Sequence, residues 1–370
     1  MFVPPHRLEV IRNYTQGSGI EIRMLEHLRD GHIDMESAAS AAGCCAVYVE
    51  QPSSFGILDP GLMQLKGVIG DETALIVGVD AVSLGIVEPP GNWGADIVVG
   101  EGQPFGIGPT AGGPIYGIFA CGQNYTRQMP GRIVGLTRDV DGKRAFTLTL
   151  STREQHIRRH RATSNICSNE TLIALMGAMH MALLGPQGLE RLALRVASAT
   201  EATKKAVTAI DGIELVDPKA SNFREFAVKL PGEASEALAH LDGEGVLGGF
   251  DLGVWWADYG MSTCLLIGAD ERTSESDIDA LVAGLSSWIG GAGARATCSH
   301  SEAQTALDGP SRSPQWAPRP LGPRSPRSFA GNRLRRGPRP ASQSWCATTL
   351  GCPTATSAST PGSTLWARAR

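Results

Sequence analysis

Short apolar runs alternate with helix-like segments over the first 120 residues of the chain. We expect strands at Ile20–Met24, Ala46–Val49, Thr73–Val79, Ile97–Val99 and Ile115–Ala120. The segments DMESAASAAG and DPGLMQLKGVIG lie between these runs and can form helices. A strand that is covered by helices on both faces has few polar positions, as TALIVGV does. The pattern therefore predicts an α/β fold with a mainly parallel sheet.

The pattern changes after Pro130. Two runs at Ile133–Thr137 and Ala145–Leu150 flank an Asp-Gly pair at 141–142, which predicts a β-hairpin. A long helical region follows, and we expect a helix stop within it at the Gly-Pro pair at 185–186.

A smaller α+β unit is expected beyond residue 211. Its strands should lie near Ile213–Val216, Phe226–Leu230 and Cys264–Ile267, and Ser274 and Asp277 have the spacing of a capping box before a closing helix. We expect four parts. Residues 1–150 should form a piece of a large α/β domain and residues 151–210 the linking helices. Residues 211–295 should form a small α+β domain, and residues 296–370 a disordered tail.

The tail differs from the rest of the chain in composition. It holds ten arginines, two acidic residues and ten of the 23 prolines, and it contains no Lys, Ile, Val, Tyr or Met. Such a segment buries too little apolar surface to offset the entropy of ordering it. We favour the hypothesis that the tail is an out-of-frame translation product. The alternative is a functional basic arm that binds a partner.

Several classes of protein are disfavoured by the sequence. It has no run of 18 apolar residues, so no membrane span is expected, and its start lacks the pattern of a secretory signal. The eight cysteines show no metal-ligand spacing, which suggests reduced thiols in the cytoplasm.

His156 and His160 lack a third ligand nearby, and we expect no metal site. The run RRHR at 158–161 lacks interleaved aromatic residues, so nucleic acid is not an expected partner.

Two stretches of the sequence are specific enough to identify relatives. They are GADIVVGEGQPFGIGPTAGGPIYGIFACGQNYTRQMPGRIVG and TLTLSTREQHIRRHRATSNICSNETLIALMGA. Both closely resemble the glycine decarboxylase (P-protein) of the glycine cleavage system, in particular the first subunit of the form that is split into two chains. The resemblance runs from about Pro5 to Leu285 and does not reach the tail, which supports the out-of-frame hypothesis.

The resemblance implies a fold of the aspartate-aminotransferase type (fold type I of pyridoxal-phosphate enzymes). It implies that pyridoxal phosphate (PLP) decarboxylates glycine and that the aminomethyl group passes to a lipoyl arm on the H-protein. In the family's second subunit, the strand after a similar GAD leads to the lysine that binds PLP, whereas this chain reads VVGEGQPFGIG there. We therefore expect PLP on a lysine-bearing partner subunit and assign no catalytic or cofactor-binding residue to this chain.

None of the chain's lysines is expected at a strand exit; they are Lys66, Lys143, Lys204, Lys205, Lys219 and Lys229. We place Lys66 on a surface-type helix. The alternatives are a self-sufficient PLP enzyme that uses Lys66 and a non-catalytic remnant that binds a partner.

Several polar residues are candidates for the interface or for a channel to the partner's active site. Asp80 ends a strand where such folds place the acid that contacts the PLP ring, but without PLP we expect it to have a structural or capping role. The candidates for contact with the partner, the carrier or a carboxylate are Arg127, Arg132 and Arg153, with structural ion pairs as the alternative. Thr163, Ser164 and Asn165 could line the channel or cap a helix.

In one respect the sequence departs from the family. The family's first subunit has further residues ahead of the part that begins here, including the first strand and helix of the large domain. Without them the sheet should have an uncovered edge. We therefore expect poor solubility or dependence on the partner subunit.

Overall fold

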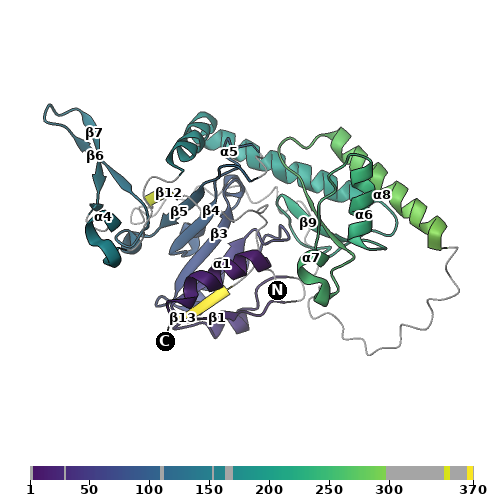
Figure 1. The fold of residues 1–370 in the computed structure, drawn as a ribbon, viewed down its shortest axis with the longest axis horizontal. Coiled ribbons are helices and arrows are strands. Elements are labelled where there is room, and N and C mark those ends of the chain that lie inside the picture. The colour runs from purple at the N-terminus through teal and green to yellow at the C-terminus, as the bar shows by residue number, and fades with distance from the viewer. Residues whose placement is uncertain are drawn as a thin grey trace.

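The computed structural model describes residues 3–28, 31–108, 112–151, 154–162, 170–296, 346–350 and 365–369. A seven-stranded sheet forms the body of the molecule, and a smaller unit packs beside it (Figure 1). A long helix, α5 (Thr171–Val207), runs along both parts, and a two-stranded arm extends from the opposite end of the large sheet (Figure 1).

The large sheet has the strand order β1-β13-β2-β3-β4-β5-β12. The pairs β2–β3 and β3–β4 are parallel and the other four are antiparallel, so five of the seven strands point the same way. This arrangement confirms the expected α/β fold. The strands are β1 (Ile20–Met24), β2 (Ala46–Gln51), β3 (Ala74–Asp80), β4 (Ile97–Glu101), β5 (Gly117–Cys121), β12 (Cys346–Leu350) and β13 (Leu365–Ala369).

The core of the large sheet is built from the runs of apolar residues that predicted it. Val47 and Val49 on β2 and Leu75 and Val77 on β3 are fully buried. They belong to one apolar cluster with side chains of α2 (Met35–Ala39) and α3 (Leu62–Ile69), whose segments were read as helices. Burying such aliphatic side chains contributes roughly 1.5–3 kcal/mol each. A further helix, α1 (Pro5–Gln16), which was not predicted, follows the N-terminus.

Two segments of the tail differ from the expectation of disorder. β13 lies between β1 and β2, and β12 pairs with β5 at the other side of the sheet. The prediction considered only side-chain burial. An unpaired strand edge also offers a row of backbone hydrogen bonds, and a segment with few apolar residues can fill it. The other tail residues after Ala296 lie outside the described part of the chain.

The small unit (residues 211–296) contains a four-stranded antiparallel sheet of order β10-β11-β9-β8. Its largest apolar cluster packs these strands against two helices and includes Phe226, Leu241, Leu265 and Leu285. The elements are β8 (Glu214–Leu215), β9 (Glu225–Lys229), α6 (Ala234–Gly243), β10 (Phe250–Asp251), α7 (Gly253–Trp256), β11 (Cys264–Gly268) and α8 (Glu275–Ala296).

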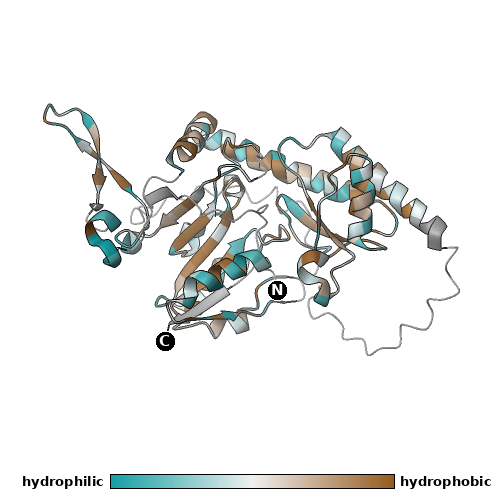
Figure 2. Ribbon diagram, viewed as in Figure 1, coloured by the Kyte–Doolittle hydropathy of each residue, from teal (hydrophilic) through white to brown (hydrophobic). Residues whose placement is uncertain are grey.

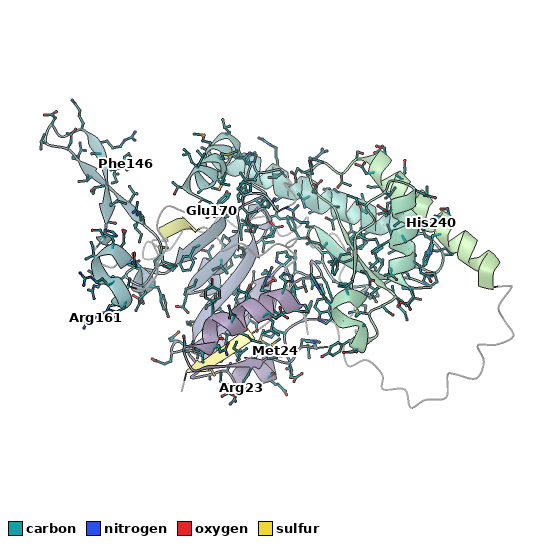
Figure 3. The ribbon with its side chains drawn as sticks, viewed as in Figure 1. Arg23, Met24, Phe146, Arg161, Glu170 and His240 are labelled. Atoms are coloured by element: carbon teal, nitrogen blue, oxygen red, sulfur yellow. The ribbon has the colours of Figure 1, made fainter. Side chains whose placement is uncertain are left out.

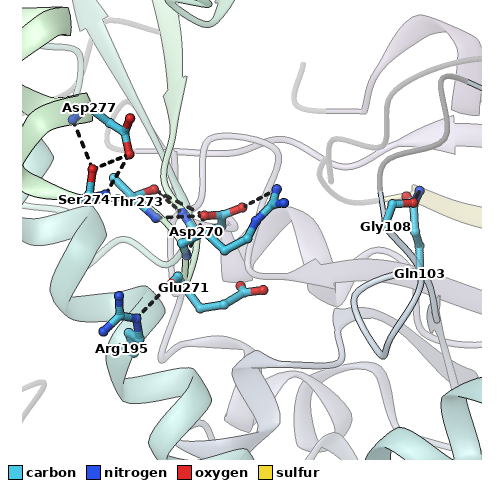
Figure 4. Close-up of polar contacts among 9 residues, drawn as sticks. Gln103, Gly108, Arg195, Asp270, Glu271, Thr273, Ser274 and Asp277 are labelled. Carbon is cyan, nitrogen blue, oxygen red and sulfur yellow. Dashed lines mark hydrogen bonds and ion pairs between the residues drawn. The ribbon is translucent and has the colours of Figure 1, made fainter.

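The capping box that opens α8 is confirmed. The Ser274 backbone N–H donates to Asp277 Oδ2 at 2.8 Å, and the Asp277 backbone N–H donates to Ser274 Oγ at 3.3 Å (Figure 4). Each residue thus satisfies a backbone donor that a helix start would leave without a partner.

Helix α5 is interrupted at the predicted stop. Gly185 has φ 62° and ψ −179°, a conformation that favours glycine, and Pro186 follows it. Helical structure resumes at once, so the Gly-Pro pair divides the helix into two stretches. By length and composition alone α5 could cross a membrane, and only 17% of its most apolar window is buried. One such helix is a weak indication, and the sequence criterion missed it because polar residues interrupt its apolar positions.

The predicted hairpin is confirmed as β6 (Ile133–Arg138) and β7 (Arg144–Thr149). We call residues 133–149 the arm, and it projects away from the body (Figure 1). Two short helical segments, α4 (Gln155–Arg158) and the 3₁₀ turn Arg159–Arg161, lie at its base. The chain also has 3₁₀ turns at Ser83–Gly85, Pro90–Trp93, Gln123–Tyr125 and Ala257–Tyr259.

Candidate functional site

The carboxyl ends of β2, β3 and β4 lie side by side. Gln51 is paired with Val79, and Asp80 is paired with Glu101. In open α/β sheets, ligands bind at this edge of the strands. Polar side chains at the edge therefore form the first place to look for chemistry.

Asp80, at the end of β3, is held by the small unit. Its Oδ2 accepts a hydrogen bond from Arg224 Nε at 2.6 Å, and its Oδ1 accepts one from the Val82 backbone N–H at 2.9 Å. Burial opposes the charge of Arg224, but the Asp80 carboxylate outweighs it and raises the arginine's pKa. These contacts are of the structural kind expected for Asp80, and they join the large sheet to the small unit.

A second carboxyl group lies close to this ion pair. Burial raises the pKa of Glu225, the first residue of β9, to about 8. The positive charge of Arg224 lowers this pKa and the negative charge of Asp80 raises it, so the three groups form one electrostatic cluster. Desolvation favours the neutral form of a buried carboxyl group.

Glu101, at the end of β4, faces its own loop. Its Oε1 accepts a hydrogen bond from the Gln103 backbone N–H at 3.0 Å, and burial raises the pKa of the carboxyl group. Beside it Tyr116 is completely buried between Gly102 and Gly177 of α5. The Tyr116 hydroxyl has no hydrogen-bond partner among the described residues. The two glycines provide the space that the aromatic ring occupies.

The end of β2 is occupied in a similar way. Glu50 is buried and accepts hydrogen bonds from Arg7 of α1 and from the Tyr48 hydroxyl. Burial opposes the charge of Arg7, but Glu50 outweighs it and raises the arginine's pKa. The acidic residues on β2, β3 and β4 at this edge, Glu50, Asp80 and Glu101, therefore all have partners within the chain.

Lys66 lies at the opposite edge of the sheet. Its Nζ donates to Asp96 Oδ2 at 2.8 Å and to the Thr73 carbonyl oxygen at 2.9 Å. Asp96 precedes the first residue of β4, and a strand of five residues spans about 17 Å. Helix α3, which carries Lys66, has one buried and one exposed side, as expected of a surface-type helix. The Lys66 side chain itself is mostly buried in this ion pair.

The other five lysines are also away from the carboxyl ends of β2, β3 and β4. Lys204 is buried on α5, where it pairs with Glu201 at 2.7 Å. Lys143 lies in the turn of the arm. Lys205 lies on α5, Lys219 precedes β9, and Lys229 is the last residue of β9.

The residues at the carboxyl edge do not fit a PLP group of this chain's own. A PLP site requires a lysine, and no lysine in the sequence comes directly after the end of β2, β3 or β4. The aspartate in the expected position is already bound to Arg224. We therefore derive no chemical step on PLP from this chain.

The structure locates two of the six predicted interface residues. Arg132 Nε lies 3.5 Å from Glu154 Oε2, which is the ion pair considered as the alternative, and Arg127 is exposed at the base of the arm. Both arginines follow β5 in the chain, and β5 lies two strands along the sheet from β3, which carries Asp80. Arg153, Thr163, Ser164 and Asn165 lie outside the described residues. Among the described residues, no group of three or more potential metal ligands occurs.

Sequence reasoning missed Arg224, Glu225 and Tyr116. A signal for the first two is visible in FREFAVKL, where a charged pair opens an otherwise apolar strand. Charged groups at such a position need partners, because burying an unpaired charge is costly. Tyr116 gives no such signal, since its neighbours Gly102 and Gly177 are distant in the sequence.

Most of the chain matches a known protein family. The family model described as glycine cleavage system P-protein matches residues 1–285. A protein from Thermococcus onnurineus named probable glycine dehydrogenase (decarboxylating) subunit 1 is 42% identical over 285 residues, which cover 76% of this chain and 63% of the relative. A protein of the same name from Pyrococcus furiosus is 41% identical, with 75% and 62% covered. The chain thus spans somewhat less than two thirds of these relatives.

Solved structures agree with the fold. A crystal structure of the glycine decarboxylase (P-protein) of the glycine cleavage system, in inhibitor-bound form, is similar with a TM-score of 0.68 and 33% identity over 77% of this chain and 63% of that chain. A cysteine desulfurase from Thermococcus onnurineus has a TM-score of 0.55 at 16% identity, covering 77% of this chain and 70% of that one, which indicates a shared fold alone.

Proposed function

Because the chain belongs to the glycine cleavage system P-protein family, we propose that it is the subunit of glycine decarboxylase that lacks the PLP-binding lysine. The observation that carries this proposal is the placement of the six lysines. None comes directly after the end of a parallel strand, and Lys66 is bound to Asp96 at the amino edge.

In this proposal a second subunit supplies the lysine and carries PLP. Glycine is the substrate, and the lipoyl group of the H-protein accepts the aminomethyl group. We propose a heterotetramer of two chains of each kind, located in the cytoplasm. This chain contributes structure and contact surface rather than reacting groups, which agrees with the occupied carboxylates at the strand ends.

The other two readings fare less well. An enzyme that uses Lys66 would need the amine at the carboxyl edge, but Asp96 and the Thr73 carbonyl hold it at the other edge. No observation on the described residues favours a non-catalytic remnant. Because the chain spans 63% of the length of its relative, the activity of the whole protein is itself part of the proposal.

Reduction with borohydride tests where PLP is bound. This chain is purified alone and together with the second subunit, incubated with PLP, reduced and mapped by peptide mass spectrometry. We expect the label on a lysine of the second subunit and none on Lys66 or Lys204. A stoichiometric label on Lys66 in the lone chain would contradict the proposal.

The activity test uses the glycine–bicarbonate exchange reaction with lipoylated H-protein. Exchange is expected only when both subunits are present. The Lys66→Arg variant retains a cation for Asp96, so its complex should exchange at the rate of the unaltered complex. Equal exchange with and without this chain would show that it is dispensable and would overturn the proposal.

A further inference from the structure

One face of the arm is apolar along its length. Antiparallel pairing places Val134 opposite Leu148 and Leu136 opposite Phe146, and residues two apart on a strand share a face. We call these four residues the apolar ladder. The other face carries the pairs Thr137–Ala145, Gly135–Thr147 and Ile133–Thr149.

The apolar ladder is uncovered. The exposed fractions are 59% for Val134, 70% for Leu136, 66% for Phe146 and 49% for Leu148. Figure 2 shows apolar segments along the arm, and Figure 3 shows Phe146 on it, away from the body of the molecule. An isolated two-stranded hairpin is marginally stable in water, and a contiguous apolar face of this kind marks an interaction site.

Both ends of the apolar ladder are cationic. Arg138 and Arg144 are paired at the outer end of the same face. Arg158, Arg159 and Arg161 are exposed at the base, where Figure 3 shows Arg161. Residues 127–161 contain nine Lys or Arg and three Asp or Glu, a net charge of +6 in a chain of net charge −4. The net charge of residues 127–161, which include the arm and its base, is therefore opposite in sign to that of the whole chain.

A second apolar stripe lies on the first half of α5. Leu172, Leu175, Met176, Met179 and Leu183 fall on one side of a helix with 3.6 residues per turn, and all five are exposed. Like the arm, this half of α5 lies at the end of the molecule away from the small unit (Figure 1). Uncovered apolar side chains thus occur on two elements at this end of the molecule.

We propose that the arm docks onto the second subunit of the enzyme, on an apolar strip flanked by carboxylates. This inference rests on the proposed function, which requires such a subunit. The apolar ladder would supply the buried centre of the contact, and the arginines at both ends would pair with the carboxylates and fix its register. Nucleic acid fits less well, because four apolar side chains occupy the face that would have to meet phosphates.

The test is a binding measurement with a matched control on the other face. The double variant Leu136→Thr, Phe146→Thr introduces β-branched residues that favour strands and removes the two most exposed side chains of the apolar ladder. The control Thr137→Ser, Thr147→Ser changes the opposite face of the same arm. Dissociation constants of the full chain with the second subunit are measured by sedimentation.

We expect the apolar-ladder variant to bind at least about 30-fold more weakly, since central apolar anchors carry most of an interface's affinity, and the control to bind within about 2-fold of the unaltered chain. Replacing Arg138 and Arg144 by Glu should slow association and reduce its dependence on salt. Equal affinity of the apolar-ladder variant and the control would overturn the inference.

Hydrogen exchange on the unaltered complex decides the case if the variant does not fold. The amides of β6 and β7 should become protected only when the second subunit is added. Protection that appears instead with the chain alone at high concentration, with anionic vesicles or with DNA would also overturn the inference. An active complex whose arm stays unprotected refutes the docking alone, whereas a PLP label on Lys66 refutes the proposed function.

Discussion

Asp80 and Arg224 form the ion pair that connects the end of β3 to the small unit. Both side chains are mostly buried, with exposed fractions of 10% and 18%. Breaking such a pair leaves one charge without compensation in a desolvated site. The pair therefore determines how firmly the two parts of the molecule are joined.

Replacing Arg224 by Leu is expected to lower the free energy of unfolding by about 3–5 kcal/mol, because the Asp80 carboxylate loses its partner. Denaturant unfolding of the complex with the second subunit measures this. Arg272→Leu is the matched control: its pair with Asp270 at 3.4 Å is more exposed, and its loss should cost less than about 1 kcal/mol. Equal effects of the two substitutions would contradict the role of burial.

Glu225 makes stability depend on pH. Its pKa is raised from 4.5 to about 8 in the folded chain, so between these values the folded state binds more protons than the unfolded state. The stabilisation is complete below pH 4.5 and is lost as pH rises towards 8. Glu225→Gln should flatten the slope of stability against pH, which is at most about 1.4 kcal/mol per pH unit for one group. The same substitution at the exposed Glu236 is the control for exchanging a carboxyl group for an amide.

At the scale of elements, α5 is positioned by a tyrosine and two glycines. A Cβ atom on Gly177 would lie 1.7 Å from the Tyr116 hydroxyl oxygen, and one on Gly102 would lie 2.3 Å from the ring. The first half of the helix can therefore approach the large sheet only because residue 177 has no side chain. In its second half, Val207 belongs to the core of the small unit.

Gly177→Ala is expected to destabilise the chain by about 1–3 kcal/mol through overpacking, and Tyr116→Phe in the same chain should restore part of this loss. Tyr116→Phe alone should be neutral or stabilising, because it removes a buried hydroxyl without a partner. Gly67→Ala on α3 meets nothing within 4 Å and should stabilise the chain by up to about 1 kcal/mol. Thermal unfolding in the complex compares the three. Destabilisation by Tyr116→Phe would contradict this packing.

The elements were predictable from local patterns, and the contacts between them were not. Strands such as TALIVGV, the Asp-Gly turn of the arm and the Ser274–Asp277 cap depend on residues close together in sequence. The pairs Asp80–Arg224 and Lys66–Asp96 join residues that are 144 and 30 positions apart. The periodicity of apolar residues carries no information about such a pairing. The sequence therefore predicts that Lys66 is not at a strand exit, but it does not predict the partners of its amine.

At the scale of the whole molecule, the large sheet depends on strands from the end of the chain. β13 pairs with both β1 and β2, and β12 covers β5. The domain boundaries predicted at 150, 210 and 295 and the out-of-frame hypothesis for the tail stay predictions. Sequencing of the gene across codons 285–300 tests the hypothesis, which an unbroken reading frame would exclude.

Shortening the chain to residues 1–296 removes both tail strands. Amides of β2 and β5 that pair with β13 and β12 should then exchange with solvent at least about tenfold faster, while amides of β3 stay protected by β2 and β4. Hydrogen exchange with peptide-level mass spectrometry measures both. Unchanged exchange in β2 and β5 would show that the tail strands do not contribute.

The position of β13 has a consequence for how the molecule assembles. β13 fills the gap of one strand between β1 and β2, and it comes from the far end of the sequence. Such a gap accepts any extended segment of suitable register, including the same segment from a neighbouring copy. At high protein concentration, two copies of the chain should therefore exchange their β13 strands and form a swapped dimer. An excess of a free peptide of sequence LWARA should compete for the gap and dissociate these dimers.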